Sequence, residues 1–162
     1  SVVIWTTTPW TIPANRAVCF GPDVDYVVLE VTEAGEDALA TVGERFAVAE
    51  ALAVEFVGRA GISNYLQIAH VKGAVFEGTQ LAHPWRGHAD ADAYYDFDVP
   101  MLPGDHVTTE AGTGFVHTAP GHGDDDYQVA HVKFGIPVPY TVNESGCYYE
   151  NVGLVPGRHA QL

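Results

Sequence analysis

Hydrophobic and polar side chains follow a two-residue period in several short stretches of this chain. Residues 65–71 alternate apolar and polar side chains, which is typical of a strand with one buried face. β-Branched and aromatic residues fill further runs that end at a proline, a glycine or an acidic turn. The pattern predicts strands at residues 2–7, 16–20, 26–32 and 65–71, and shorter ones at 75–81 and 114–118.

Two stretches have instead the features of helices. Residues 44–49 predict a strand that leads into a helix through about Val57, with Gly58 and Gly61 at its end. Residues 124–134 begin with three aspartates, which suit the positive end of a helix dipole. Glycine and proline at 135–137 then end this second helix.

Composition favours a β-rich fold. Seventeen glycines and ten prolines are spread over the 162 residues, which indicates many turns between short elements. Residues 85–95 break the pattern and predict a surface loop, and residues 100–108 predict a turn at Pro-Gly. No repeat or linker divides the chain. We therefore predict one α+β domain over residues 1–162, with a β-barrel-like core and flanking helices.

The charge is strongly acidic, with 7 basic against 21 acidic residues and a formal net charge of −14. A domain that holds nucleic acid by itself should be basic, so an RNA partner would have to be held mainly by other parts of a larger protein. No apolar run approaches the roughly 20 residues of a membrane helix. The start lacks the features of a signal peptide and predicts a fragment of something larger. Cys19 and Cys147 are expected to be reduced thiols in the cytoplasm.

The first segment with candidate chemistry runs from Trp5 to Arg16. Four threonines, two tryptophans and one asparagine lie within its first eleven residues, and two prolines predict a loop or a single helical turn. Threonine hydroxyls donate and accept hydrogen bonds from a side chain that is stiff at χ1. Such a cluster can hold ribose hydroxyls, a carbonyl oxygen and a water. Strand propensity followed by a proline-bounded turn explains the same composition without a site.

The second segment runs from Gly112 to Tyr127. Its glycines allow the backbone to approach a ligand closely, and His117 ends a predicted strand. Three consecutive aspartates then open the predicted helix. Capping and the helix dipole explain one or two of them, but three exceed what a cap needs.

These residues leave several kinds of site open. A metal site could use His117, His122 and an aspartate, because imidazole and carboxylate suit zinc, although the spacing matches no zinc signature. Ser63 and Ser145 lack the glycine setting of a nucleophile elbow, and Cys147 has no companion motif. A lysine of the phosphate-loop type is also missing. The residues alone therefore predict a polar pocket without a clear metal or nucleophile.

Together the two segments resemble the editing domains of isoleucyl-tRNA synthetases. The match is to their threonine-rich peptide and to a second motif that reads GTG, HTAPGHG and DDY in this chain. It covers nearly the whole chain with order and spacing preserved, whereas valyl and leucyl enzymes resemble the chain more loosely. The resemblance implies an insertion in the Rossmann-type catalytic domain of a class I synthetase, folded as a β-barrel core with flanking helices.

The resemblance also implies a hydrolase that removes valine from tRNA(Ile). Valine and isoleucine differ by one methylene, worth about 1–3 kcal/mol in a hydrophobic pocket, and isoleucyl-tRNA synthetase is itself the case that illustrates this limit. A second pocket that admits valine and excludes isoleucine would complete the selection. The expected substrate is the ester of valine with the 3′ adenosine, with valyl-adenylate as a second candidate.

Residue roles follow from the match to the family's motifs. Asp126 is expected to bind the α-ammonium group through a charge-assisted hydrogen bond, and Asp124 and Asp125 are expected to be helix-start acids. Thr7 and Thr8 are expected to contact the aminoacyl group and the terminal adenosine. The remaining assignments are His117 at the border of the amino-acid pocket, where it rejects isoleucine and contacts the ribose side, Trp10 as a pocket wall, and Thr6, Thr11 and Asn15 as substrate-binding residues.

No general base is evident, so the expected mechanism is positioning of a water by threonine hydroxyls, backbone amides and a ribose hydroxyl. Editing is expected to need no cofactor or metal, whereas the parent synthetase would use ATP and Mg. Expected partners are the valylated 3′ end of tRNA(Ile) and the rest of the synthetase in cis, with no membrane and a monomeric domain. The alternatives are a non-catalytic RNA-binding barrel and a valyl- or leucyl-type editing domain.

Overall fold

The computed structural model describes residues 1–161, and the chain divides into two compact units. The first unit consists of Ser1–Thr6, Cys19–Glu77 and Pro103–Val116, and the second of Thr7–Val18, Gly78–Leu102 and His117–Leu162. Each unit is assembled from three separate stretches, so no linker or shift in composition marks it in the sequence. The single domain expected from the sequence stays a prediction.

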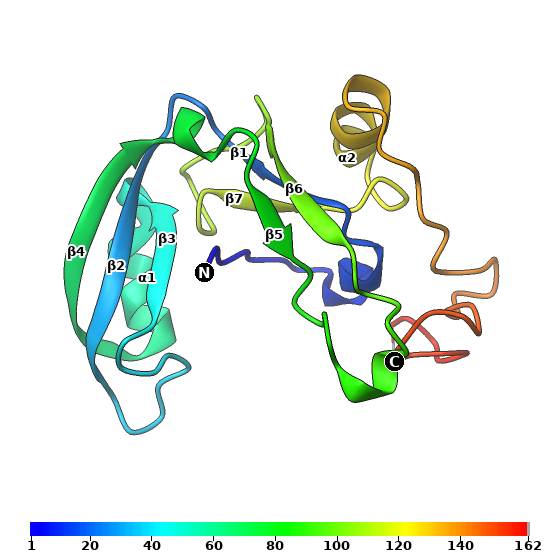
Figure 1. Ribbon diagram of the computed structural model, residues 1–162, viewed down its shortest axis with the longest axis horizontal. Helices are drawn as coiled ribbons and strands as arrows, with labels where there is room; N and C mark the ends of the chain where they lie inside the picture. Colours follow the sequence, from blue (N-terminus) through cyan, green and yellow to red (C-terminus); the bar gives the residue numbers. More distant parts are fainter. Residues whose placement is uncertain (162) are drawn as a thin grey trace. The chain divides into compact units, whose positions relative to one another are not determined.

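An antiparallel three-stranded sheet forms the body of the first unit (Figure 1). Its strands are β2 (Asp25–Ala34), β3 (Arg45–Ala49) and β4 (Ile62–Lys72), in the order β3-β2-β4. In the register of the sheet, Val28 of β2 lies opposite Ala47 of β3 and Ala69 of β4. The three strands confirm those predicted from residues 26–32, 44–49 and 65–71.

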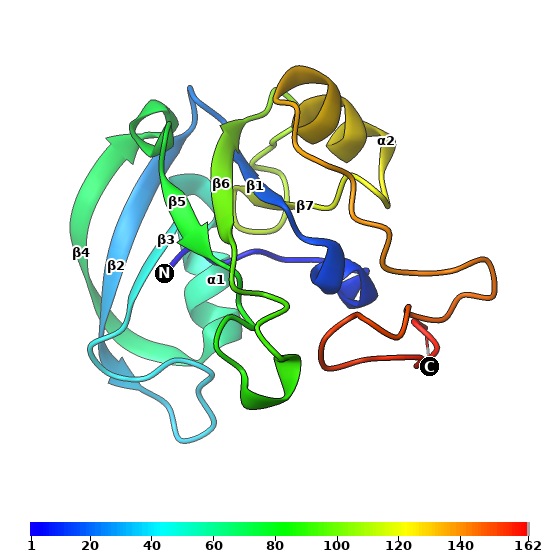
Figure 2. The ribbon, with the colours of Figure 1, turned by 45° about the vertical axis from the view of Figure 1, so that its right-hand side comes forward.

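Helix α1 (Ala53–Ala60) follows the 3-10 turn η2 (Glu50–Leu52) and lies against this sheet (Figures 1 and 2). It ends at Gly61, whose φ of +69° lies in the left-handed region that favours glycine at helix ends. Phe56 and Val57 of α1 pack on a buried layer of apolar side chains from the sheet. This layer consists of Val27, Leu29, Val31, Val48 and Ile62.

A second sheet contains β1 (Ala17–Phe20), β5 (Gln80–Ala82), β6 (Asp98–Pro103) and β7 (Phe115–Thr118). Its strand order is β5-β6-β1-β7, and β5 pairs antiparallel with β6. Among residues 1–161 each sheet has two different edge strands, so the strands form open sheets. The α+β class is therefore confirmed, but the predicted barrel-like core is not a closed barrel.

Short helical segments make up the remaining regular structure. They include η1 (Pro9–Ala14), η3 (Gly73–Phe76) and η4 (Ala89–Ala91). The helix predicted over residues 124–134 is confirmed as α2 (Asp124–Asp126), which continues directly into the π-helical segment η5 (Tyr127–Lys133). Within the part of the chain that the structure describes, no helix combines the length and apolar character required to cross a membrane.

Three sequence predictions differ from the structure. The strand predicted at residues 2–7 is wrong, because only Val2 pairs, in an isolated bridge with Ala47. The strand predicted at residues 75–81 is not continuous: residues 75–76 belong to η3, 80–81 belong to β5, and 77–79 lie between them. The loop predicted at residues 85–95 is not all surface, since Ala91 and Tyr95 are buried. Strand propensity describes single residues, whereas pairing and burial depend on partners far along the chain.

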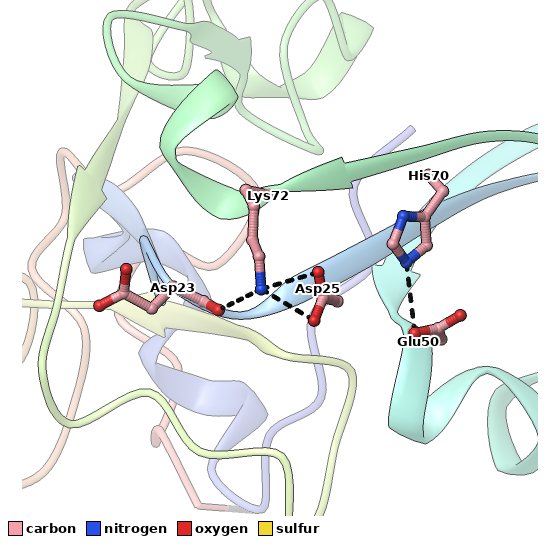
Figure 3. A network of polar contacts seen from close by, with 5 residues as sticks. All are labelled: Asp23, Asp25, Glu50, His70 and Lys72. Atoms are coloured by element: carbon pink, nitrogen blue, oxygen red, sulfur yellow. Dashed lines mark hydrogen bonds and ion pairs between the residues drawn. The ribbon is translucent and has the colours of Figure 1, made fainter.

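Exposed charges connect β2 with β4 and β4 with η2 (Figure 3). Lys72 Nζ lies 2.9 Å from both carboxylate oxygens of Asp25 and donates to the backbone oxygen of Asp23 at 3.1 Å. His70 Nε2 lies 3.3 Å from Glu50 Oε2. The hydrogen bond from Lys72 lowers the pKa of Asp25. Water and salt screen such exposed pairs, so this network contributes little to the stability of the sheet.

Candidate functional site

The threonine-rich segment forms a short 3-10 helix, which confirms the predicted helical turn. Pro9 begins η1, and the fixed φ of proline suits the first position of a helix. Both the backbone nitrogen and Oγ1 of Thr11 donate to Thr8 O at 2.9 Å. Asn15 N donates to Ile12 O at 3.0 Å and closes the last turn. Local hydrogen bonds therefore fix the backbone between Thr8 and Asn15.

His117, at the end of β7, connects the second motif to this 3-10 helix. Its Nε2 lies 2.9 Å from Thr11 Oγ1, and its Nδ1 lies 2.6 Å from Asn15 Nδ2. The same Nδ2 donates to Ala17 O at 3.0 Å, as an amide nitrogen should. Because an amide nitrogen only donates, Nδ1 of His117 accepts and the ring proton lies on Nε2, directed at Thr11. The two motifs therefore meet through direct hydrogen bonds.

Burial determines the charge of His117. Desolvation, with a smaller effect of His83 and His122, lowers the pKa of His117 to about 4. The imidazole is therefore neutral near pH 7. Since Nε2 carries the proton and Nδ1 accepts from Asn15, the ring has no unoccupied lone pair with which to take a proton from water. In this arrangement His117 can affect a reaction by position and contact, but not as a general base.

Asp126 is fixed by the loop that follows His117. Its Oδ2 accepts from Ala119 N at 2.7 Å. A Cβ on Gly123 would lie 3.3 Å from Asp126 Cγ, so glycine leaves room for the carboxylate. Asp126 is half-buried, whereas Asp124 and Asp125 are exposed. This difference is consistent with a distinct role for Asp126 among the three aspartates.

Trp10 is held at both its ring and its backbone. Its ring lies edge-on to His122 with centroids 5.0 Å apart and an interplanar angle of 82°. His122 Nε2 lies 3.1 Å from Thr141 Oγ1, and burial lowers the pKa of His122. Tyr148 OH donates to Trp10 O at 2.6 Å. A half-buried tryptophan fixed in this way is suited to be the wall of a pocket.

The other predicted threonines lie differently. Thr7 and Thr8 belong to the second unit and are exposed, whereas Thr6 belongs to the first unit and is half-buried. Their contacts with a substrate stay predictions. All the other predicted residues belong to the second unit, and hydrogen bonds link four of the set directly: Thr8, Thr11, Asn15 and His117.

His83, a member of an aromatic cluster, supports the backbone of η1, and this contact was not predicted from the sequence. His83 is buried, stacks on Tyr95 with centroids 4.4 Å apart, and donates from Nε2 to Ile12 O at 3.0 Å. The guanidinium of Arg16 lies 4.2 Å from the centroid of Phe97. The density of aromatic residues between 83 and 97 was the available signal, because such side chains are seldom all left in solvent.

The metal site considered from the sequence is not assembled by residues 1–161 in this structure. They contain no group of three or more histidine, cysteine, aspartate or glutamate side chains that could hold a metal ion. In the set considered from the sequence, His117 would first have to give up its bond to Thr11 or Asn15. His122 would likewise have to leave Thr141.

A cavity of about 390 Å³ lies within the first unit. Its walls include Trp5, Phe46 and Phe56, and Glu55 and Arg59, which also line it, form an exposed ion pair at 2.8 Å. None of the eight residues predicted for the site lines this cavity. The cavity is therefore separate from the residues predicted for the site.

Comparison with known proteins relates nearly the whole chain to one group. No family model matches the chain. The isoleucine–tRNA ligase of Gluconobacter oxydans is 47% identical over 159 residues, which cover 98% of this chain and 16% of that protein. The isoleucine–tRNA ligase of Caulobacter vibrioides is 49% identical over 160 residues, which cover 96% of this chain and 16% of that protein. The chain thus spans 16% of the length of these relatives.

Solved structures agree on the fold. The editing domain of the P. knowlesi cytosolic leucyl-tRNA synthetase matches with a TM-score of 0.59 at 14% identity, covering 78% of this chain and 48% of that one. The P. falciparum editing domain matches with a TM-score of 0.54 at 15% identity, covering 75% and 42%. This chain is therefore a homologue of a segment of the isoleucine–tRNA ligases, with the fold of the editing domains of class I aminoacyl-tRNA synthetases.

Proposed function

We propose that this chain hydrolyses the ester that joins valine to tRNA(Ile) and spares the isoleucine ester. The observation that carries the proposal is that His117 is hydrogen-bonded to both Thr11 and Asn15, because these two bonds unite the two motifs of the family. Homology to isoleucine–tRNA ligases supports tRNA(Ile) as the acceptor. Valine is then the expected error, since it is smaller than isoleucine by one methylene.

In the proposed reaction, water attacks the ester carbonyl and the bond between the carbonyl carbon and the ribose oxygen breaks. The proton that the attacking water loses passes to the leaving ribose oxygen, and valine and tRNA are released. Asp126 binds the α-ammonium group, and the hydroxyls of Thr7 and Thr8 orient the ester and the water. His117 takes no proton, so a ribose hydroxyl of the substrate polarises the water. Proximity and preorganised donors supply the rate enhancement.

Selectivity in this proposal comes from exclusion. Forcing an extra methylene into a closely packed pocket typically costs about 1–3 kcal/mol. In this scheme Trp10 and His117 form the walls of the pocket. Both rings are held in place, that of Trp10 by its contact with His122 and that of His117 by its two hydrogen bonds. Rigid walls exclude isoleucine better than walls that can move aside.

The proposed partner is the valylated 3′ end of tRNA(Ile), with valyl-adenylate as a second substrate. With 7 basic and 21 acidic residues, the chain itself should bind the tRNA body weakly. The proposed source of tRNA affinity is the rest of a synthetase in cis. The chain spans only 16% of the length of the isoleucine–tRNA ligases that it matches. Editing uses no cofactor in this scheme, whereas ATP and Mg belong to aminoacylation. The proposed location is the cytoplasm, and the proposed state of the domain is a monomer.

A deacylation assay tests this function. Val-tRNA(Ile), Ile-tRNA(Ile) and Thr-tRNA(Val) are incubated with the protein, with and without EDTA. We expect Val-tRNA(Ile) to be hydrolysed at least about tenfold faster than Ile-tRNA(Ile), with no effect of EDTA. Preference for Thr-tRNA(Val) would indicate a valyl-type specificity, and loss of activity in EDTA would indicate a metal. Tight, salt-sensitive binding of uncharged tRNA without hydrolysis would favour a binding module.

A further inference from the structure

The 3-10 helix η1 has a gap in its own hydrogen bonding at Trp10. In a 3-10 helix each carbonyl accepts from the backbone nitrogen three residues later. For Trp10 that residue is Pro13, which has no N–H to donate. The i+3 bond that would hold the Trp10 peptide group therefore cannot form within the helix.

Tyr148 supplies a donor at this position. Its hydroxyl donates to Trp10 O at 2.6 Å, across 138 residues of sequence. The phenol is buried, with 6% of the residue exposed. Its backbone is anchored as well, because Tyr148 N donates to Arg158 O at 2.9 Å and the residue pairs with Val142 in an antiparallel bridge. An anchored donor can hold an acceptor in place.

We propose that Tyr148 is a positioning residue for editing, which sets the place of the Trp10 wall and thereby the discrimination between valine and isoleucine esters. This inference rests on the proposed function. The ring of Trp10 has its edge contact with His122, and its carbonyl accepts from Tyr148. The nitrogen of the same peptide group, which belongs to Thr11, donates to Thr8 O. Without the bond to Tyr148, this nitrogen side keeps its hydrogen bond, but the Trp10 carbonyl can tilt and the ring can shift away from a larger side chain.

A second tyrosine provides a matched control. Tyr95 OH donates to Gly153 O at 2.7 Å, and Tyr95 is fully buried in the same unit. Tyr148→Phe and Tyr95→Phe therefore each remove one buried hydroxyl that donates to a backbone carbonyl. Only the first of these bonds reaches the threonine-rich segment, and Tyr95→Phe keeps the ring that stacks on His83. A loss of stability alone should affect both variants similarly.

The experiment measures kcat/KM for hydrolysis of Val-tRNA(Ile) and of Ile-tRNA(Ile) by the wild-type protein and by both variants. The ratio of kcat/KM for Val-tRNA(Ile) to that for Ile-tRNA(Ile) measures discrimination. We expect Tyr148→Phe to lower this ratio by about 3- to 10-fold, as the loss of one buried hydrogen bond implies. Tyr95→Phe should leave the ratio within about twofold. The amide ¹⁵N shift of Thr11, whose nitrogen shares the peptide group of Trp10 O, should change only in Tyr148→Phe.

Each outcome has a distinct meaning. An unchanged ratio and an unchanged Thr11 shift in Tyr148→Phe overturn the inference while the proposed function stands. Equal changes in both variants also overturn it, because they indicate general destabilisation. A wild-type protein that hydrolyses neither ester refutes the proposed function, and the inference with it.

Discussion

The side-chain nitrogen of Asn15 lies 2.6 Å from Nδ1 of His117, and this contact determines which ring nitrogen carries the proton. Asn15→Asp replaces the donor by an acceptor, so Nδ1 would have to be protonated. We expect the pKa of His117 to rise from its value of about 4, because a carboxylate stabilises the imidazolium. The ¹⁵N shifts of the ring, followed against pH, should show the Nε2–H form in the wild type and a protonated Nδ1 in the variant.

The control for this change is Asn151→Asp, which adds the same charge at an exposed position of the same unit. It should leave the ring shifts of His117 as they are in the wild type. If Asn15→Asp also leaves them unchanged, then Asn15 does not set the tautomer of His117.

The low pKa of His117 makes the stability of the fold depend on pH. Above the ordinary pKa of 6.5 the residue is neutral in both folded and unfolded chains, and its titration contributes nothing. Below 6.5 the unfolded chain binds a proton that folded His117 does not accept until about pH 4. The free energy of unfolding should therefore fall between pH 6.5 and about 4, by up to about 3 kcal/mol from this residue.

Urea unfolding at a series of pH values checks this effect. His117→Gln lacks the titration, so the difference in stability between wild type and variant should shrink as the pH falls. Part of the slope should persist in the variant, because desolvation also lowers the pKa values of His83 and His122. Parallel curves for the two proteins would contradict the assignment to His117.

The charge of Asp126 can be tested separately from the hydrogen bond that its carboxylate accepts from Ala119 N. Asp126→Asn keeps an oxygen that can accept from Ala119 N but removes the charge that would bind an ammonium group. A hydrogen bond to a charged group is worth about 1.5–3 kcal/mol, so we expect kcat/KM for Val-tRNA(Ile) to fall by about 10- to 100-fold. Asp125→Asn, at an exposed position on the same turn, should change it by less than about twofold. Equal rates for the two variants would refute the role of Asp126.

Local patterns predicted those parts of the fold that depend on near neighbours. The alternation at residues 65–71 marks β4, and the aspartates and Gly135 mark the helix at 124–134, because strand faces and helix ends are set within a few residues. Residues 2–7 have the same strand propensity, yet only Val2 pairs. A β-branched run forms a strand only where a partner edge is present, and that edge is not encoded locally.

The site was predicted only where motifs carried the signal. His117, Asn15 and Thr11 were found as members of two motifs, but their hydrogen bonds depend on contacts across 102 and 106 residues. His83 and Tyr148 were missed because their acceptors, Ile12 O and Trp10 O, lie 71 and 138 residues away. A side chain that supports a backbone carbonyl leaves no periodic or compositional trace in the sequence.

Gly114, in the second motif, is required by space as well as by backbone conformation. Its φ is +80°, and an added Cβ would lie 2.4 Å from Ala49 Cβ and 3.2 Å from Tyr26 Cε1. Gly43 has a φ of +91° with no atom within 4 Å of an added Cβ. Both Gly→Ala variants should lose about 1–2 kcal/mol because an L-residue is strained in this region.

Only Gly114→Ala adds an overlap, so it should be less stable than Gly43→Ala by a further amount of about 1–3 kcal/mol. Urea unfolding with an unchanged m-value measures the difference. Gly114 O also accepts from Tyr26 OH at 2.6 Å, so the backbone cannot move aside without losing a buried bond. Equal losses of stability in the two variants would mean that the backbone at Gly114, directly before β7, moves aside at little cost. It would then be a poor support for the hydrogen bonds on which the proposed pocket depends.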